Sequence, residues 1–341
     1  MTTNAPMARR GEIQALRELS WRVGRDPLLT QGSTGNSSVK LDGDLWIKAS
    51  GRWMADCLSD EILIPLDLAE VQNCVRQEVD PAERYPCASL ETAMHAVLPH
   101  LVVLHVHCVD TIAWAVRTDA PSLLGPKLEG LPWQWIPYVV SGLPLAREIQ
   151  SASPETKIFI LGNHGLAIGG EDAASVEGLL AEVRKRLAIK PRKAHPADYA
   201  ALLDACWDSP WDLPDDDAVH ALGTDITSQR ILSAGLLYPC QAIFSDSTAS
   251  DLFRPIPLSA FGENWRGQYD DRPFLIIEGR GVVVRKSMTP AELAMMSGLA
   301  QVVQRIDAAA SLRYLRPSEI AAISGQAAYR YRELASVGQA R

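Results

Sequence analysis

Three histidines are the residues of this chain whose types and spacing are best suited to chemistry. His105 and His107 form an H-x-H pair within an apolar segment, and His164 stands between Asn163 and Gly165. On a β-strand both members of the pair point to the same face, because side chains alternate with a period of two. A third imidazole beside them would give a three-histidine site with one open coordination position, which is typical of a catalytic metal. The pair alone leaves an ordinary core or surface role open.

Glu91 is a carboxylate near the start of an expected helix over residues 89–98. A carboxylate there often only interacts with the helix dipole or caps the helix. The functional interpretation is a general acid/base beside the metal, which requires a partly desolvated carboxylate near the reacting carbon. His95 lies four residues later, on the same helix face. We expect it to be a supporting or packing residue rather than a ligand.

Two segments of small residues, 35–38 and 49–51, could bind an anion through backbone N–H groups and hydroxyls. Neither has the G-x-x-x-x-G-K-[ST] spacing of a nucleotide P-loop. Taken singly, each is more typical of an ordinary turn. Lys48 precedes the second segment and could supply a cation or be a solvated residue at a strand end.

The elements that must position these residues alternate between helices and strands. We expect amphipathic or capped helices over residues 11–23, 89–98 and 171–187. We expect a hairpin over residues 39–48, after a small polar loop over residues 31–38. Further strands are predicted over residues 101–107, 135–140, 157–161 and 166–168. This pattern indicates an α/β protein.

Composition limits the class of protein. The 341 residues suggest two domains, and 47% hydrophobic with 22% charged residues is normal for a globular chain. The net charge of -8 argues against nucleic-acid or anionic-membrane partners. The sequence predicts neither a signal peptide nor a transmembrane helix. Six cysteines without a C-x-x-C pair favour a reduced, cytoplasmic setting.

The domain organisation predicted from composition has three parts. A catalytic domain occupies residues 10–190, a proline-rich linker residues 191–217, and a smaller C-terminal α+β domain of unknown role residues 218–341. The second domain could be a degenerate repeat of the first. Residues 275–284 and the helix that follows them resemble residues 159–168 and the helix that follows those. Arg280 stands there in place of His164. The alternative is chance recurrence of a common strand–turn–strand–helix pattern.

Together these motifs resemble the class II aldolase/adducin family. They occur in order along residues 10–190: residues 35–38, Ser50 with Gly51, Ser89 with Glu91, the H-x-H pair, and residues 163–165. Residues 89–99 look especially like the aldolase half of bifunctional rhamnulose-phosphate aldolase/dehydrogenase proteins. The resemblance implies an α/β/α fold with a central, mostly antiparallel sheet, assembled as a homo-oligomer, with a tetramer favoured.

The resemblance also implies a cofactor and a role for each motif. A divalent metal, with zinc favoured and manganese, cobalt or iron as alternatives, would bind the three histidines, and Glu91 would be the catalytic acid/base. Residues that would hold a substrate phosphate are Asn36, Ser50, Gly51 and Ser89. Two departures put the substrate's identity in question: Leu90 replaces a second phosphate-binding serine of some aldolases, and Cys108 replaces a usual proline.

The implied function is a metal-dependent lyase that cleaves a sugar phosphate or related hydroxy-keto compound through a metal-stabilised enediolate. An epimerase, a dehydratase or a decarboxylase could use the same site, and a non-catalytic, adducin-like assembly module is a further alternative. The second domain could also cover the site for an unphosphorylated substrate, with Arg280, Arg285 and Lys286 available for a carboxylate.

Overall fold

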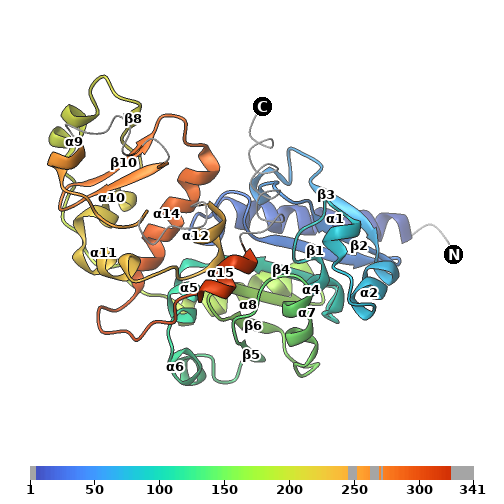
Figure 1. Ribbon diagram of the computed structural model, residues 1–341. Helices are drawn as coiled ribbons and strands as arrows, with labels where there is room; N and C mark the ends of the chain where they lie inside the picture. The colour runs from blue at the N-terminus through green and yellow to red at the C-terminus, as the bar shows by residue number, and fades with distance from the viewer. Residues whose placement is uncertain (1–4, 245–251, 262–268, 270–271, 324–341) are drawn as a thin grey trace.

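The computed structural model describes residues 5–244, 252–261, 269 and 272–323, which form two parts with one β-sheet each (Figure 1). The N-terminal region contains a seven-stranded sheet in the order β3 (Leu63–Asp67), β2 (Asp44–Lys48), β1 (Asn36–Leu41), β4 (Val102–Val106), β7 (Gly165–Gly170), β6 (Ile158–Leu161) and β5 (Trp133–Ile136). Every neighbouring pair is antiparallel except β5 and β6. The expected mostly antiparallel sheet is therefore confirmed.

Helices cover both faces of this sheet. The helical elements of the region are α1 (Ala5–Gly24), the short 3-10 helix Met54–Asp56, α2 (Leu68–Arg76), α3 (Pro81–Arg84), α4 (Thr92–Val97), α5 (Val109–Ala115), α6 (Ala120–Lys127), α7 (Leu143–Gln150) and α8 (Ala173–Leu187). Apolar residues of α1 and α8 pack against one face, and those of α4 and α7 against the other. The N-terminal region thus has the predicted α/β/α layers.

Strand β4 shows how the chain directs the histidine pair to one face. Val102, Leu104 and Val106 belong to the apolar cluster under α1 and α8, whereas Val103 packs with α4 and α7. His105 and His107 follow Val103 at intervals of two residues, so they share its face. The pair therefore lies on the side of the sheet where α4 begins.

Several predicted boundaries differ from the structure, for example the strand predicted over residues 135–140, which is β5 (Trp133–Ile136), and two of them lie next to the histidines. Residues 36–38 belong to β1 rather than to a loop, with Asn36 opposite His105 in the register. Small polar residues have low strand propensity, but pairing with β4 overrides it. Helix α4 begins at Thr92 and not at Ser89, and Glu91 occupies its N-cap position without a side-chain capping bond. The Glu91 side chain is therefore available for other contacts.

The C-terminal region is a separate small region built around three strands, β8 (Trp211–Asp212), β9 (Phe274–Ile277) and β10 (Gly281–Arg285). Its described helices include α9 (Tyr199–Cys206), α10 (Asp217–Thr224), α11 (Ile226–Ser233), α12 (Pro239–Phe244), α14 (Pro290–Arg305) and α15 (Pro317–Ile323). The predicted strand–turn–strand–helix order is present both in β6–β7–α8 and in β9–β10–α14. Their sheets differ, because β6 also pairs with β5 whereas β10 also pairs with β8. No described helix has the length and apolar character needed to cross a membrane.

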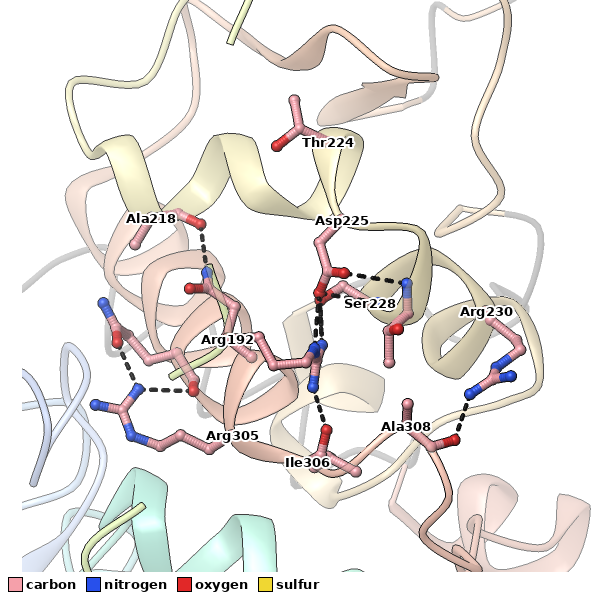
Figure 2. Close-up of polar contacts among 12 residues, drawn as sticks. Arg192, Ala218, Thr224, Asp225, Ser228, Arg230, Arg305, Ile306 and Ala308 are labelled. Carbon is pink, nitrogen blue, oxygen red and sulfur yellow. Dashed lines mark hydrogen bonds and ion pairs between the residues drawn. The ribbon is translucent and has the colours of Figure 1, made fainter. Parts of the chain in front are cut away.

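Residues 191–217, expected as a linker, contain α9 and β8 and pack closely on the C-terminal region. The Arg192 backbone N–H donates to Gln304 O at 2.8 Å. Its guanidinium pairs with Asp225 at 2.5 Å and also donates to the Ile306 carbonyl, as Figure 2 shows. These contacts hold the start of residues 191–217 against the beginning of α11 and the end of α14.

A buried ion pair joins the two regions where α5 packs on α14. Arg305 Nε lies 2.9 Å from Asp110 Oδ1, which also accepts the Ile189 backbone N–H at 3.0 Å. Both helices also contribute apolar residues, such as Ile112 and Val302, to one buried cluster. The buried Asp110 carboxylate of α5 therefore has its ion partner, Arg305, in the C-terminal region.

Arg305→Met should lower the free energy of unfolding by about 3–5 kcal/mol, because it leaves the Asp110 carboxylate buried without its ion partner. Urea titration followed by circular dichroism measures the change. The double variant Asp110→Asn/Arg305→Met should recover part of the loss, because neither charge remains. A single-variant loss comparable with that of an exposed ion pair, below about 1 kcal/mol, would contradict the assigned role.

Candidate functional site

The three histidines meet at one point of the structure. His105 comes from β4, His107 follows that strand directly, and His164 lies in the turn between β6 and β7. Their ring centroids are 4.9–5.3 Å apart, and one ligand atom from each lies within 4.8 Å of the others. The Nε2 atoms of His105 and His107 are 3.1 Å apart. All three side chains are buried, with at most 7% of their surface exposed.

Glu91 reaches the same point from the N-cap position of α4. Its Oε2 lies 3.3 Å from His105 Nε2, and its Oε1 lies 3.0 Å from His164 Nε2. The fold therefore brings the predicted acid/base and the three predicted ligands together. Among the described residues, the three histidines are the only group of three or more His, Cys, Asp or Glu side chains that could hold a metal ion. Glu91 lies beside them.

The protonation pattern of this cluster favours a bound cation. His105 Nδ1 lies 3.0 Å from the Leu166 carbonyl, so that nitrogen carries the proton. Burial lowers the pKa of His105 to about 4, which keeps the ring neutral with the Nε2 lone pair facing Glu91. Burial tends to raise the pKa of Glu91, whereas positive charge at His105 and His164 lowers it well below its usual range, and a cation held between these rings would act in the same direction. An ionised carboxylate and imidazole lone pairs thus converge, and this donor set fits zinc or a neighbouring divalent metal.

A buried hydrogen-bond chain orients Glu91. Asn36 Nδ2 donates to Glu91 Oε2 at 2.7 Å and to Ser89 Oγ at 3.0 Å. His95 Nε2 lies 2.5 Å from Asn36 Oδ1, and Ser38 Oγ lies 2.6 Å from His95 Nδ1. Burial lowers the pKa of His95 to about 3, so the neutral ring accepts from Ser38 and donates to Asn36. This direction fixes the Asn36 amide with its NH₂ toward Glu91.

A cavity that is partly open to solvent, with about 560 Å³ of empty space, lies beside the cluster. The predicted site residues that line it are Asn36, Ser50, Ser89, Glu91, His107 and His164. His105 lies beneath its surface with no exposed area, and Gly51 does not line it. The alternative anion-binding residues Arg280, Arg285 and Lys286 do not line it either. Arg280 pairs with Asp198, and the Arg285 guanidinium lies 4.2 Å from the ring centroid of Trp211.

The model of the family described as "Class II Aldolase and Adducin N-terminal domain" matches residues 17–189, which is half of the chain. The chain belongs to the class II aldolase and adducin family. The matched residues include the three histidines and Glu91, and they end before the C-terminal region. The family assignment therefore covers the three histidines and Glu91 but not the second sheet.

Individual relatives are more distant. The chain is 25% identical over 186 residues to the "Uncharacterized oxidoreductase YuxG" of Bacillus subtilis (strain 168), which covers 46% of this chain but only 27% of that protein. Among solved structures, it is similar to the N-terminal class II aldolase domain of a conserved protein from Thermoplasma acidophilum, with 22% identity, a TM-score of 0.47, and 52% and 92% of the two chains covered. The L-fuculose-1-phosphate aldolase from Thermus thermophilus has 20% identity, a TM-score of 0.35, and 51% and 92% coverage.

Lys48 is the one lysine or arginine among the described residues that line the cavity of this class II aldolase family member. Its Nζ donates to the carbonyl oxygens of Ser33 (3.0 Å), Arg52 (2.6 Å) and, more weakly, Ala49 (3.4 Å). Burial lowers its pKa to about 7, although the charge of Glu91 acts in the opposite direction. Lys48 thus connects the loop that precedes β1 to the turn that follows β2.

Lys48→Met should lower the free energy of unfolding by about 1–3 kcal/mol, because it leaves buried carbonyl oxygens without a donor. Chemical denaturation measures the loss. The matched control is Lys185→Met on the exposed face of α8, which should change stability by less than about 0.5 kcal/mol. Equal effects of the two substitutions would show that Lys48 does not connect the loop to the turn.

Helix α12 contributes the cavity residues that sequence patterns did not indicate. Pro239, Cys240 and Ile243 line the cavity, and Cys240 Sγ lies 3.3 Å from His107 Nδ1. Burial raises the pKa of the Cys240 thiol, so it remains neutral. The contact joins residues 133 positions apart and follows no local motif, so nothing in the sequence alone could have revealed it. Ser141, which lies 3.4 Å from Glu91 Oε1, was missed for the same reason.

Proposed function

We propose that this protein is a divalent-metal-dependent lyase of the aldolase type, acting on a sugar phosphate or a related hydroxy-keto compound. The observation that carries the proposal is the convergence of three imidazoles and one ionised carboxylate at the wall of a cavity. Membership of the class II aldolase and adducin family supports the same chemistry. We further propose a homotetramer that works in the cytoplasm on a small molecule.

His105, His107 and His164 would hold the metal, with zinc favoured over manganese, cobalt and iron. When bound there, the cation would polarise the substrate carbonyl and stabilise the negative charge that develops as the C–C bond breaks. Their burial limits contact with water, which strengthens these electrostatic effects.

Glu91 would move the proton at the carbon next to the carbonyl. In the direction of bond formation, its ionised carboxylate removes that proton and leaves an enediolate, which then attacks the aldehyde. In the direction of cleavage, the same group returns the proton to the enediolate carbon. The low pKa of Glu91 and the hydrogen bond from Asn36 support a carboxylate that is ionised and fixed in direction.

The small-residue side of the cavity would hold the other end of the substrate. We propose that Ser50 and Ser89, which line this side, bind a phosphate or another anionic group together with the adjacent Gly51, near Lys48. Asn36 has both amide protons engaged with Glu91 and Ser89, so we propose that its main role is to orient the acid/base. Leu90 lines this side where some relatives have a phosphate-binding serine, which favours fewer phosphate contacts here.

An epimerase, a dehydratase or a decarboxylase would need the same residues, because each passes through a related anion. A non-catalytic assembly role is less well supported, since a site without chemistry would have no need for three intact imidazoles beside an ionised carboxylate. The reaction class is therefore the main question for experiment.

The test combines metal analysis with a substrate panel. Purified protein should contain about one transition metal per chain by elemental analysis. Loaded protein is then mixed in D₂O with ketose phosphates, sugar acids and unphosphorylated ketoses, and NMR follows both deuterium exchange beside the carbonyl and the products. Cleavage products support the lyase, and inverted stereochemistry or loss of water or CO₂ identifies an alternative. Protein without metal affinity, or without exchange on any compound, would contradict the proposal.

A further inference from the structure

The turn that carries His164 is attached to the C-terminal region. Asn163, just before His164, donates from Nδ2 to the carbonyl oxygens of Leu237 at 2.8 Å and Arg313 at 2.7 Å. Arg313 Nη1 donates back to Asn163 Oδ1 at 3.2 Å. Leu237 lies two residues before α12, so these hydrogen bonds fix the position at which α12 begins beside the candidate ligands.

Cys240 is the residue of α12 that reaches those ligands. Its Sγ lies 3.3 Å from His107 Nδ1, and both side chains are buried. His107 Nε2 faces His105 Nε2 at 3.1 Å, so Nε2 is the nitrogen that points toward the shared metal position. A neutral imidazole that offers Nε2 to a metal carries its proton on Nδ1. The group that accepts this proton fixes the tautomer and the direction of the ring.

The other ligand of the H-x-H pair has such a partner within its own sheet. His105 Nδ1 donates to the Leu166 carbonyl of β7. For His107 the corresponding position is occupied by the Cys240 sulfur, which comes from the C-terminal region. Cys240 lies outside residues 17–189, the part matched by the family model.

We propose that Cys240 is a positioning residue of the metal centre, where its sulfur accepts the Nδ1 proton of His107 and holds Nε2 toward the cation. The inference rests on the proposed metal site and adds that the C-terminal region completes it. All three ligands come from the N-terminal region, yet the orientation of one depends on α12.

The first test measures zinc affinity of the metal-stripped full chain by competition with a chromophoric chelator. Cys240→Ala should weaken zinc binding by about 10–100-fold, the usual effect of losing a partner of a metal ligand. Cys240→Ser should stay close to wild type, because a hydroxyl oxygen also accepts a hydrogen bond. The matched control is Cys206→Ala, which removes another buried thiol of the C-terminal region away from the cavity and should leave affinity unchanged.

A second readout needs no change at Cys240. Histidine-selective ¹⁵N NMR of the zinc-loaded wild-type protein should show His107 with its proton on Nδ1 and zinc on Nε2, with the signal assigned through the backbone resonances of His107. Zinc bound to Nδ1 of His107, with the proton on Nε2, would overturn the inference. So would unchanged zinc affinity of Cys240→Ala, or equal weakening in Cys240→Ala and Cys240→Ser, which would indicate packing. Wild-type protein that binds no zinc would overturn the proposed function itself. Wild-type protein that binds zinc, with unchanged affinity in Cys240→Ala, would overturn only this inference.

Discussion

His164→Ala is expected to abolish stoichiometric metal binding. The substitution removes one of the three proposed nitrogen ligands, so the loss of affinity should exceed the roughly 10–100-fold that follows removal of a partner of a ligand. Turnover should fall to background, because the remaining pair cannot hold the cation next to Glu91. Elemental analysis after dialysis and chelator competition measure the loss.

The control for this variant is another buried histidine. His100 is 5% exposed and does not line the cavity, so His100→Ala should keep the full metal content. A His164→Ala protein that still binds one metal per chain would show that the ion lies elsewhere. Equal metal loss in both variants would indicate general destabilisation of the fold.

Glu91→Gln is expected to lower turnover by about 10²–10⁴-fold, the usual contribution of a general acid/base, while metal binding persists. The amide has nearly the shape of the carboxylate and can still accept the Asn36 hydrogen bond, but it cannot take a proton. The rate of deuterium exchange beside the substrate carbonyl should fall with turnover. Both rates and the metal content are measured on the same preparation.

The control for Glu91→Gln is Glu177→Gln, which changes a half-exposed carboxylate in a surface ion pair with Arg22. That variant should keep wild-type turnover. Full exchange activity in Glu91→Gln would sink the acid/base assignment. Loss of the metal in Glu91→Gln would instead make Glu91 a ligand, which is a different role from the one proposed.

Local patterns were sufficient for the parts of the fold that depend on short-range rules. The H-x-H spacing placed His105 and His107 on one face, because strand periodicity holds wherever the strand lies. The capped helix α8 and the order of strands and helices followed from hydrophobic spacing and turn residues. Boundaries failed where a distant neighbour decided them, as at Asn36, whose strand conformation depends on pairing with β4.

The sequence by itself determined the three histidines as the candidate ligands, their likeness to the class II aldolase and adducin family, and the α/β class. Only the tertiary structure decided which groups surround the ligands. The chain from Ser38 through His95 and Asn36 to Glu91, and the contact of Cys240 with His107, join residues up to 133 positions apart. Such contacts have no sequence period, because they depend on how whole elements pack, here α5 on α14 and the Asn163 turn on the start of α12.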